Sequence, residues 1–232
     1  MTFEPDKQAA LEEALAQAKL NPVSADNWNQ VAIASLQVSN LEAAVEYIGR
    51  AINLEPQVAL NYSNRGRVLF ALGRKEEALA DYTQALELEP TSELYSNRSV
   101  INLALGRAGA ALYDLNEAFD LAPTPEAQAT ALLNRVAFFA NKGMSEDAWR
   151  DINRVIELQP EDPRHRLTRA NLAFALNQHE LGLSEIEEAL RLDQSGLLRF
   201  SLLQLADQLE AYLPTSPQPE ISLRLIQLIR HK

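Results

Sequence analysis

The 232-residue sequence contains no cysteine. Disulfides, thiolate metal sites and cysteine nucleophiles are therefore excluded, and a packed core has to hold the fold together. Hydrophobic residues make up 47% of the chain, which is enough to bury such a core. A reducing compartment fits this composition, and we expect a cytoplasmic protein.

Positive charge and long apolar runs are also scarce. The chain has 21 Lys and Arg against 32 Asp and Glu, a formal net charge of -11. Nucleic-acid-binding surfaces need clustered basic residues, so no nucleic acid is expected as a partner. No stretch approaches the roughly 18 uninterrupted apolar residues of a membrane-spanning helix. Residues 1–10 lack the apolar segment of a secretion signal, so we expect a soluble protein that is not secreted through a cleaved signal.

Glycine is limited to eight residues, and apolar residues recur three and four apart, which favours helices throughout. Prolines recur at intervals of 34, 34, 33 and 37 residues, each two residues after a leucine. Because proline stops a helix, this period indicates a repeated helical hairpin. The prolines are Pro22, Pro56, Pro90, Pro123 and Pro160.

The same residue types return in phase within these intervals. Counted from first positions at Ala25, Ala59, Ser92, Ala129 and Pro163, position 20 is small, position 27 is Ala or Val, and position 30 is always leucine. Small residues at positions 20 and 27 let two helices pack closely. The pattern resembles the tetratricopeptide repeat (TPR) family.

The resemblance implies an all-α fold, a right-handed α-solenoid of five TPR helical hairpins with N- and C-terminal capping helices. Residues 1–24 would form the N-terminal capping helix and residues 195–213 the C-terminal one, covering the ends of the stack. The five repeats would occupy residues 25–58, 59–91, 92–128, 129–162 and 163–194. Residues 214–232 would form a proline-rich linker and a terminal amphipathic helix.

Two local signals refine the boundaries of the helices. Thr124 followed by Pro125 is a helix start, so the first helix of repeat 4 should begin one turn early. Gln194 replaces the closing proline of repeat 5, which predicts that this helix continues towards Ser195.

The last helix, 221–232, is too short to bury its apolar face alone, and the linker that precedes it is short. We therefore expect it to dock on residues 197–213, with dimerisation or membrane contact as alternatives.

Arginine occupies position 7 wherever an acidic residue occupies position 23. Repeat 1, with Val31 and Tyr47 at these positions, lacks both charges. Because an antiparallel hairpin brings the two positions level, the pattern predicts internal salt bridges that leave little arginine charge on the groove, rather than an anion-binding ladder. The pairs are Arg65 with Asp81, Arg98 with Asp114, Arg135 with Asp151, and Arg169 with Glu185.

The family resemblance implies that partners lie in a concave groove lined by the first helix of each repeat. Asparagine amides there suit hydrogen bonding to an extended peptide, although asparagine at position 6 also serves hairpin geometry in this family. We expect Arg67, Phe70 and Phe174 to face solvent without a packing role. The predicted groove residues are Asn29, Ile33, Leu36, Asn64, Arg67, Phe70, Asn97, Val100, Leu103, Asn134, Asn141, Arg164, Asn171 and Phe174.

Catalytic signals are absent from the sequence. The three histidines, His165, His179 and His231, are scattered, and no nucleophile motif, metal-ligand spacing or phosphate loop occurs. We expect no enzyme activity, no cofactor and no metal. The favoured function is an adaptor or assembly factor, monomeric, that binds a protein or peptide in the groove. A self-associating scaffold or a membrane-peripheral factor that uses the terminal helix is the alternative.

Overall fold

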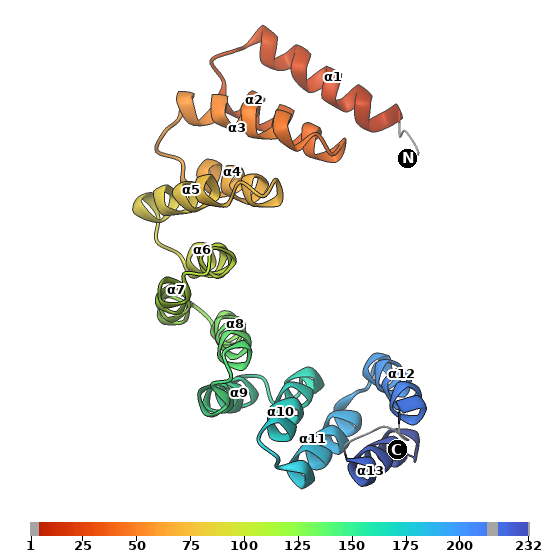
Figure 1. Cartoon of the computed structure of the whole chain (residues 1–232). Coiled ribbons are helices and arrows are strands. Elements are labelled where there is room, and N and C mark those ends of the chain that lie inside the picture. The colour runs from red at the N-terminus through yellow and green to blue at the C-terminus, as the bar shows by residue number, and fades with distance from the viewer. Residues whose placement is uncertain (1–4, 213–217, 232) are drawn as a thin grey trace. The chain divides into compact units, whose positions relative to one another are not determined.

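The computed structural model describes residues 5–212 and 218–231, and every regular element in these ranges is an α-helix (Figure 1). The predicted all-α architecture is confirmed. The helices are α1 (Pro5–Leu20), α2 (Ala25–Gln37), α3 (Leu41–Leu54), α4 (Ala59–Ala71), α5 (Lys75–Leu88), α6 (Ser92–Ala104), α7 (Ala108–Asp120), α8 (Pro125–Asn141), α9 (Ser145–Leu158), α10 (Pro163–Ala175), α11 (His179–Leu192), α12 (Leu197–Tyr212) and α13 (Pro219–His231).

The chain divides into two compact units, Met1–Leu121 and Ala122–Lys232. In the first unit, α1 packs on α2, and the hairpins α2/α3, α4/α5 and α6/α7 follow, with α3 against α4 and α5 against α6. The second unit contains the hairpins α8/α9 and α10/α11, with α9 against α10, and ends in the pair α12/α13. The five hairpins coincide with the five expected repeats.

Each hairpin turns through one residue with positive φ at position 15 of its repeat. Glycine occupies this position in repeats 2 to 4, with φ of 77°, 74° and 70° at Gly73, Gly106 and Gly143. Ser39 and Asn177 take the same conformation in repeats 1 and 5, with φ of 60° and 59°. Left-handed backbone just after a helix ends it cleanly, and glycine adopts it without steric cost.

Small residues bring the two helices of a hairpin together. In α4/α5, Ala78 and Ala85 are fully buried. Position 8 of the same repeat is Gly66, where an added Cβ would lie 2.9 Å from the ring of Tyr82. The ring therefore crosses the hairpin at the one place where the facing helix has no side chain.

Two of the local predictions have opposite outcomes. Helix α8 begins at Pro125 with Thr124 as its N-cap, and the Thr124 hydroxyl accepts a hydrogen bond from the Ala127 amide at 3.2 Å. The predicted early start is confirmed. The prediction for repeat 5 is wrong, because α11 ends at Leu192. The Asp193 carboxylate instead accepts from the Ser195 hydroxyl and the Arg199 amide, so this segment forms the start of α12.

The terminal helix α13 packs on its own chain. Ile226 and Ile229 are buried in a cluster with Leu202 and Ala206 of α12 and with Ala170 and Ile186 of the last hairpin. Helix α13 also contacts α11. The predicted docking is confirmed, although the helix begins at Pro219, and Leu213 and Lys232 lie outside the described residues. At the other end of the chain, Leu11 and Ala18 of α1 bury against Trp28 and Val31, as expected of a capping helix.

Candidate functional site

All four predicted arginine–acid pairs are present. The Nε and Nη2 groups of Arg65 donate to the two carboxylate oxygens of Asp81 at 2.8 and 2.7 Å, and hydrogen bonding to Asp81 raises the pKa of Arg65. Arg98 forms the same kind of contact with Asp114, with 17% and 1% of the two side chains exposed. The remaining pairs are Arg135 with Asp151 at 2.6 Å and Arg169 with Glu185 at 2.5 Å. The arginines therefore leave little free charge for a ligand.

The same arginines also contact the preceding hairpin, a feature that the sequence reasoning missed. Arg169 donates to the Asn153 amide oxygen at 2.9 Å, and Arg98 donates to the Thr83 hydroxyl at 3.4 Å. Both acceptors occupy position 25 of the preceding repeat. The joint occurrence of arginine at position 7 and an acid at position 23 among the repeats could reveal only the pairing within a hairpin. The contact with position 25 links neighbouring hairpins.

In the first unit, the outward side of α2, α4 and α6 carries most of the predicted groove residues that reach solvent. We call this surface the first-helix face and define it by Asn29, Ile33, Asn64, Arg67, Asn97, Val100 and Leu103. Ile33 and Val100 are half exposed, at 49% and 50%, and Arg67 is exposed. Exposed aliphatic side chains beside amides and one cation form a surface with both apolar and hydrogen-bonding contacts to offer.

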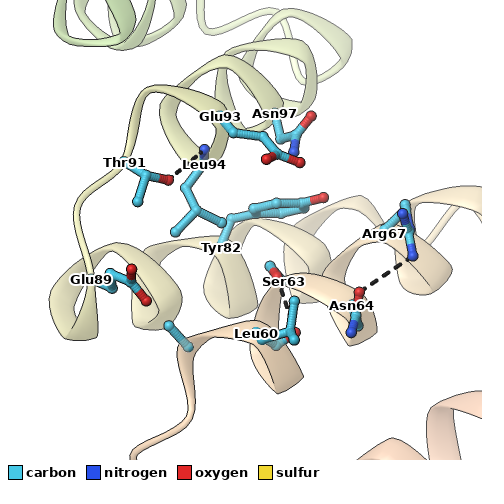
Figure 2. A pocket seen from close by; sticks show the side chains of 11 residues that line it. Leu60, Ser63, Asn64, Arg67, Tyr82, Glu89, Thr91, Glu93, Leu94 and Asn97 are labelled. Atoms are coloured by element: carbon cyan, nitrogen blue, oxygen red, sulfur yellow. Dashed lines mark hydrogen bonds between the residues drawn. The ribbon is translucent and has the colours of Figure 1, made fainter. Parts of the chain in front are cut away.

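A pocket of about 320 Å³ opens on this face between α4 and α6 (Figure 2). Its walls include Leu60, Ser63, Asn64 and Arg67 of α4, and Glu93, Leu94 and Asn97 of α6. Arg67 donates to the Asn64 amide oxygen at 3.3 Å. The structure thus brings together three of the predicted groove residues, Asn64, Arg67 and Asn97.

Tyr82 of α5 also lines this pocket, although it is not among the groove residues predicted from the sequence. Figure 2 shows its ring lying between α4 and α6, with the hydroxyl at the end nearer Arg67. Burial raises the pKa of the Tyr82 phenol, so the hydroxyl stays protonated and can donate a hydrogen bond. One signal was available in the sequence: repeat 2 alone combines an aromatic residue at position 24 with glycine at position 8.

Other predicted groove residues have partners within the chain. Asn29 donates to the Asn61 amide oxygen at 3.0 Å. In the second unit, Arg164 pairs with Asp162 and lies at the rim of a separate pocket near the start of α12. Asn134, Asn141 and Asn171 are exposed in that unit. These three amides remain available to a ligand.

The expectation that Phe70 and Phe174 lack a packing role is wrong. Phe70 is partly buried against the core cluster that contains Leu69 and Tyr82. Phe174 lies over Gly182, where an added Cβ would come within 2.7 Å of its ring, and packs beside Ile186. Leu36 is likewise partly buried, against the cluster around Ile48. These side chains support the hairpins from the first-helix side.

Within residues 5–212 and 218–231, no group of three or more His, Asp or Glu side chains is arranged to hold a metal ion. None of the helices in the described part of the chain combines the length and apolarity needed to cross a bilayer.

Comparisons with known proteins find similarity to tetratricopeptide repeat proteins. The family model of the tetratricopeptide repeat matches residues 59–92, which contain the hairpin α4/α5. The small glutamine-rich tetratricopeptide repeat-containing protein 2 of Mycosarcoma maydis is 30% identical over 89 residues, which are 38% of this chain and 25% of that protein. The chain therefore spans about a quarter of the length of this curated relative.

Solved structures show the same fold. YrrB, described as a TPR protein with an unusual peptide-binding site, superposes with a TM-score of 0.59 at 21% identity, over 82% of this chain and 96% of its own. The C-terminal part of a TPR repeat-containing protein from Cytophaga hutchinsonii superposes with a TM-score of 0.74 at 14% identity, over 98% and 92% of the two chains. At these identities the likeness concerns the fold alone.

Proposed function

Because the chain is a tetratricopeptide repeat protein, we propose that it is an adaptor that binds an extended segment of another protein on its first-helix face. The family and fold support a role in protein–protein interaction. The observation that carries the finer proposal is the pocket between α4 and α6, where Asn64, Arg67 and Asn97 converge beside exposed aliphatic residues.

Two features of this surface suit a peptide. The amides of Asn64 and Asn97 offer both donors and acceptors, as a peptide main chain requires. Ile33 and Val100 stay exposed although the residues on either side of each are buried, and Leu103 is 40% exposed, so all three offer apolar contacts to peptide side chains. YrrB, which shares the fold, is described as having a peptide-binding site, and this precedent supports a similar use here.

The alternative functions use the terminal helix. Self-association or membrane contact through α13 would need the apolar face that now packs on α12 and α11. In the structure this face, with Ile226 and Ile229, is already covered by the chain itself. The geometry therefore favours the first-helix face, and we infer neither a catalytic role nor a cofactor.

A matched pair of valine substitutions tests the proposal. Peptides would be selected from a random displayed library on the purified protein, and their affinities measured for two variants. Val100→Glu places a charge on the first-helix face and should weaken binding at least about tenfold. Val23→Glu makes the same change in the α1–α2 turn, where Val23 is 76% exposed, and should leave affinity unchanged. Equal affinities for the two variants would refute the proposal.

A further inference from the structure

The pocket between α4 and α6 contains a hydroxyl that hairpin packing does not require. In the other four hairpins, position 24 is aliphatic, with Ile48, Leu115, Ile152 and Ile186, and these residues fill the space between the helices without a polar atom. Tyr82 is as buried as they are, at 4% exposed, yet it lines the pocket. Gly66 provides the room for its ring. The tyrosine thus extends from the second helix to the first-helix face.

The Tyr82 hydroxyl can both donate and accept a hydrogen bond in this pocket. It makes no hydrogen bond to any residue that the structure describes, whereas the neighbouring Ser63 hydroxyl donates to the Leu60 carbonyl at 3.0 Å. The Tyr82 oxygen is not fully buried, so solvent in the pocket reaches it. A ligand in the pocket can form a hydrogen bond with this hydroxyl in place of solvent.

The charges beside this hydroxyl have opposite signs. Arg67 lies on the α4 side and Glu93 on the α6 side, and both are exposed. They act on the pKa of the Tyr82 phenol in opposite directions, since Arg67 lowers it and Glu93 raises it, and all three side chains line the same pocket. Figure 2 shows Glu93 on the far side of the ring from Asn64, next to Asn97.

This arrangement discriminates between the side chains that a peptide could place in the pocket. A carboxylate could accept from Tyr82 and Arg67, but it would face the like charge of Glu93 and has no donor for it. An ammonium group could donate to Glu93, but it would face the like charge of Arg67 and cannot accept from any donor of the pocket. An apolar side chain would cover the Tyr82 hydroxyl without bonding it. A carboxamide fits all three groups, because its oxygen accepts while its nitrogen donates.

We propose that this pocket is a specificity subsite for the side-chain amide of asparagine or glutamine in a bound peptide. Tyr82 and Arg67 donate to the amide oxygen, and Glu93 accepts from the amide nitrogen. The inference rests on the proposed function, since the amide is presented by a peptide lying on the first-helix face. Sites built to hydrogen-bond a polar group reject analogues that lack it more strongly than apolar pockets reject a change of size.

The pocket can be tested without a known partner. The probes are N-acetyl-glutamine methylamide and its glutamate, lysine and methionine counterparts, titrated into the full chain carrying ring-labelled tyrosine. The glutamine probe should shift the Tyr82 resonances and half-saturate at about tenfold lower concentration than the other three, as expected for two or more hydrogen bonds. In Tyr82→Phe, which keeps the ring and its packing, the glutamine preference should fall about three- to tenfold. Equal binding of all four probes, or a preference unchanged by Tyr82→Phe, would overturn the subsite.

A second arm separates this inference from the proposed function. In library peptides whose affinity depends on Val100, each Asn or Gln would be replaced by Met and by Glu. Replacement at one position of the peptide should lower its affinity for the native chain about tenfold, and should lower its affinity for the Tyr82→Phe variant by a smaller factor. Val100-dependent peptides that tolerate every replacement would overturn the subsite and leave the proposed function standing. A library that yields no Val100-dependent peptide would overturn the proposed function, and the capped amides would then decide the pocket alone. A thermal melt of Tyr82→Phe checks that it is folded.

Discussion

The hairpin α6/α7 and the C-terminal pair α12/α13 use arginine–carboxylate pairs in opposite ways. In the hairpin, Arg98 and Asp114 lie inside, with 17% and 1% of their side chains exposed. At the C-terminal pair, Arg230 bonds Asp207 and Glu210 at the surface, where 40% of its side chain is exposed. The core between α12 and α13 contains apolar residues such as Ile226 and Ile229 instead.

Burial, and not the number of ion pairs, determines how much each pair contributes to the free energy of unfolding. An exposed pair contributes about 0–1 kcal/mol, because water solvates the separated charges almost as well. Removing one member of a buried pair costs about 3–5 kcal/mol, because the other charge is left without a partner. The hairpin should therefore depend on its charges and the C-terminal pair on its apolar contacts.

The largest expected effect comes from removing the apolar contacts of α13. Deleting residues 214–232 should lower the melting temperature of the second unit more than any single substitution, because it uncovers the cluster around Leu202, Ala206 and Ile186. The variant should also bind an apolar dye. The substitution Leu223→Ala is the control, because Leu223 is in the same helix but 43% exposed, and it should melt close to the native chain. An unchanged melting temperature after the deletion would show that α13 contributes nothing to the unit.

The next effect concerns the buried charges. Asp114→Ala should lower the free energy of unfolding by about 3–5 kcal/mol, because it leaves Arg98 uncompensated. It also deprives the Asn102 amide, which donates to Asp114 at 2.8 Å, of its acceptor. Urea denaturation of the full chain would measure the change.

Repeat 1 supplies the control for this prediction. There the equivalent positions are Val31, Ser35 and Tyr47, and Ser35 bonds the Val31 carbonyl at 2.8 Å, so the hairpin is satisfied without charges. The triple variant Arg98→Val, Asn102→Ser and Asp114→Tyr transfers that arrangement. It should lose less stability than Asp114→Ala alone. A larger loss would mean that the charges carry a role beyond mutual satisfaction.

The sequence contained enough to predict features that depend on regular spacing. Prolines marked the hairpins, and the joint presence or absence of arginine and acid marked the ion pairs. The apolar face of residues 221–229 and the short linker before it predicted the docking of α13. Each of these follows from the geometry of one hairpin or one helix.

Features that depend on the shape of neighbouring side chains could not be predicted in the same way. Phe174 was expected to face solvent because the family resemblance places it in the groove, but Gly182 leaves a gap that its ring fills. Tyr82 belongs to the second helix of its hairpin, and only its length and the gap at Gly66 carry the hydroxyl into the pocket. In both cases a large side chain on one helix of a hairpin fills the space that a glycine leaves on the other helix.

The smallest expected effect tests the other half of the comparison. Arg230→Ala removes the bonds to Asp207 and Glu210 and should change the free energy of unfolding by no more than about 1 kcal/mol. Because these charges are exposed, even this effect should shrink in about 1 M salt, where the Debye length falls to roughly 3 Å. The loss in Asp114→Ala should persist in the same salt, because the buried arginine is poorly screened. Urea denaturation of both variants at low and high salt measures this contrast. Similar salt sensitivity in the two variants would mean that the internal pair is solvated as well as the surface one, and burial would no longer explain the difference between the hairpin and the C-terminal pair.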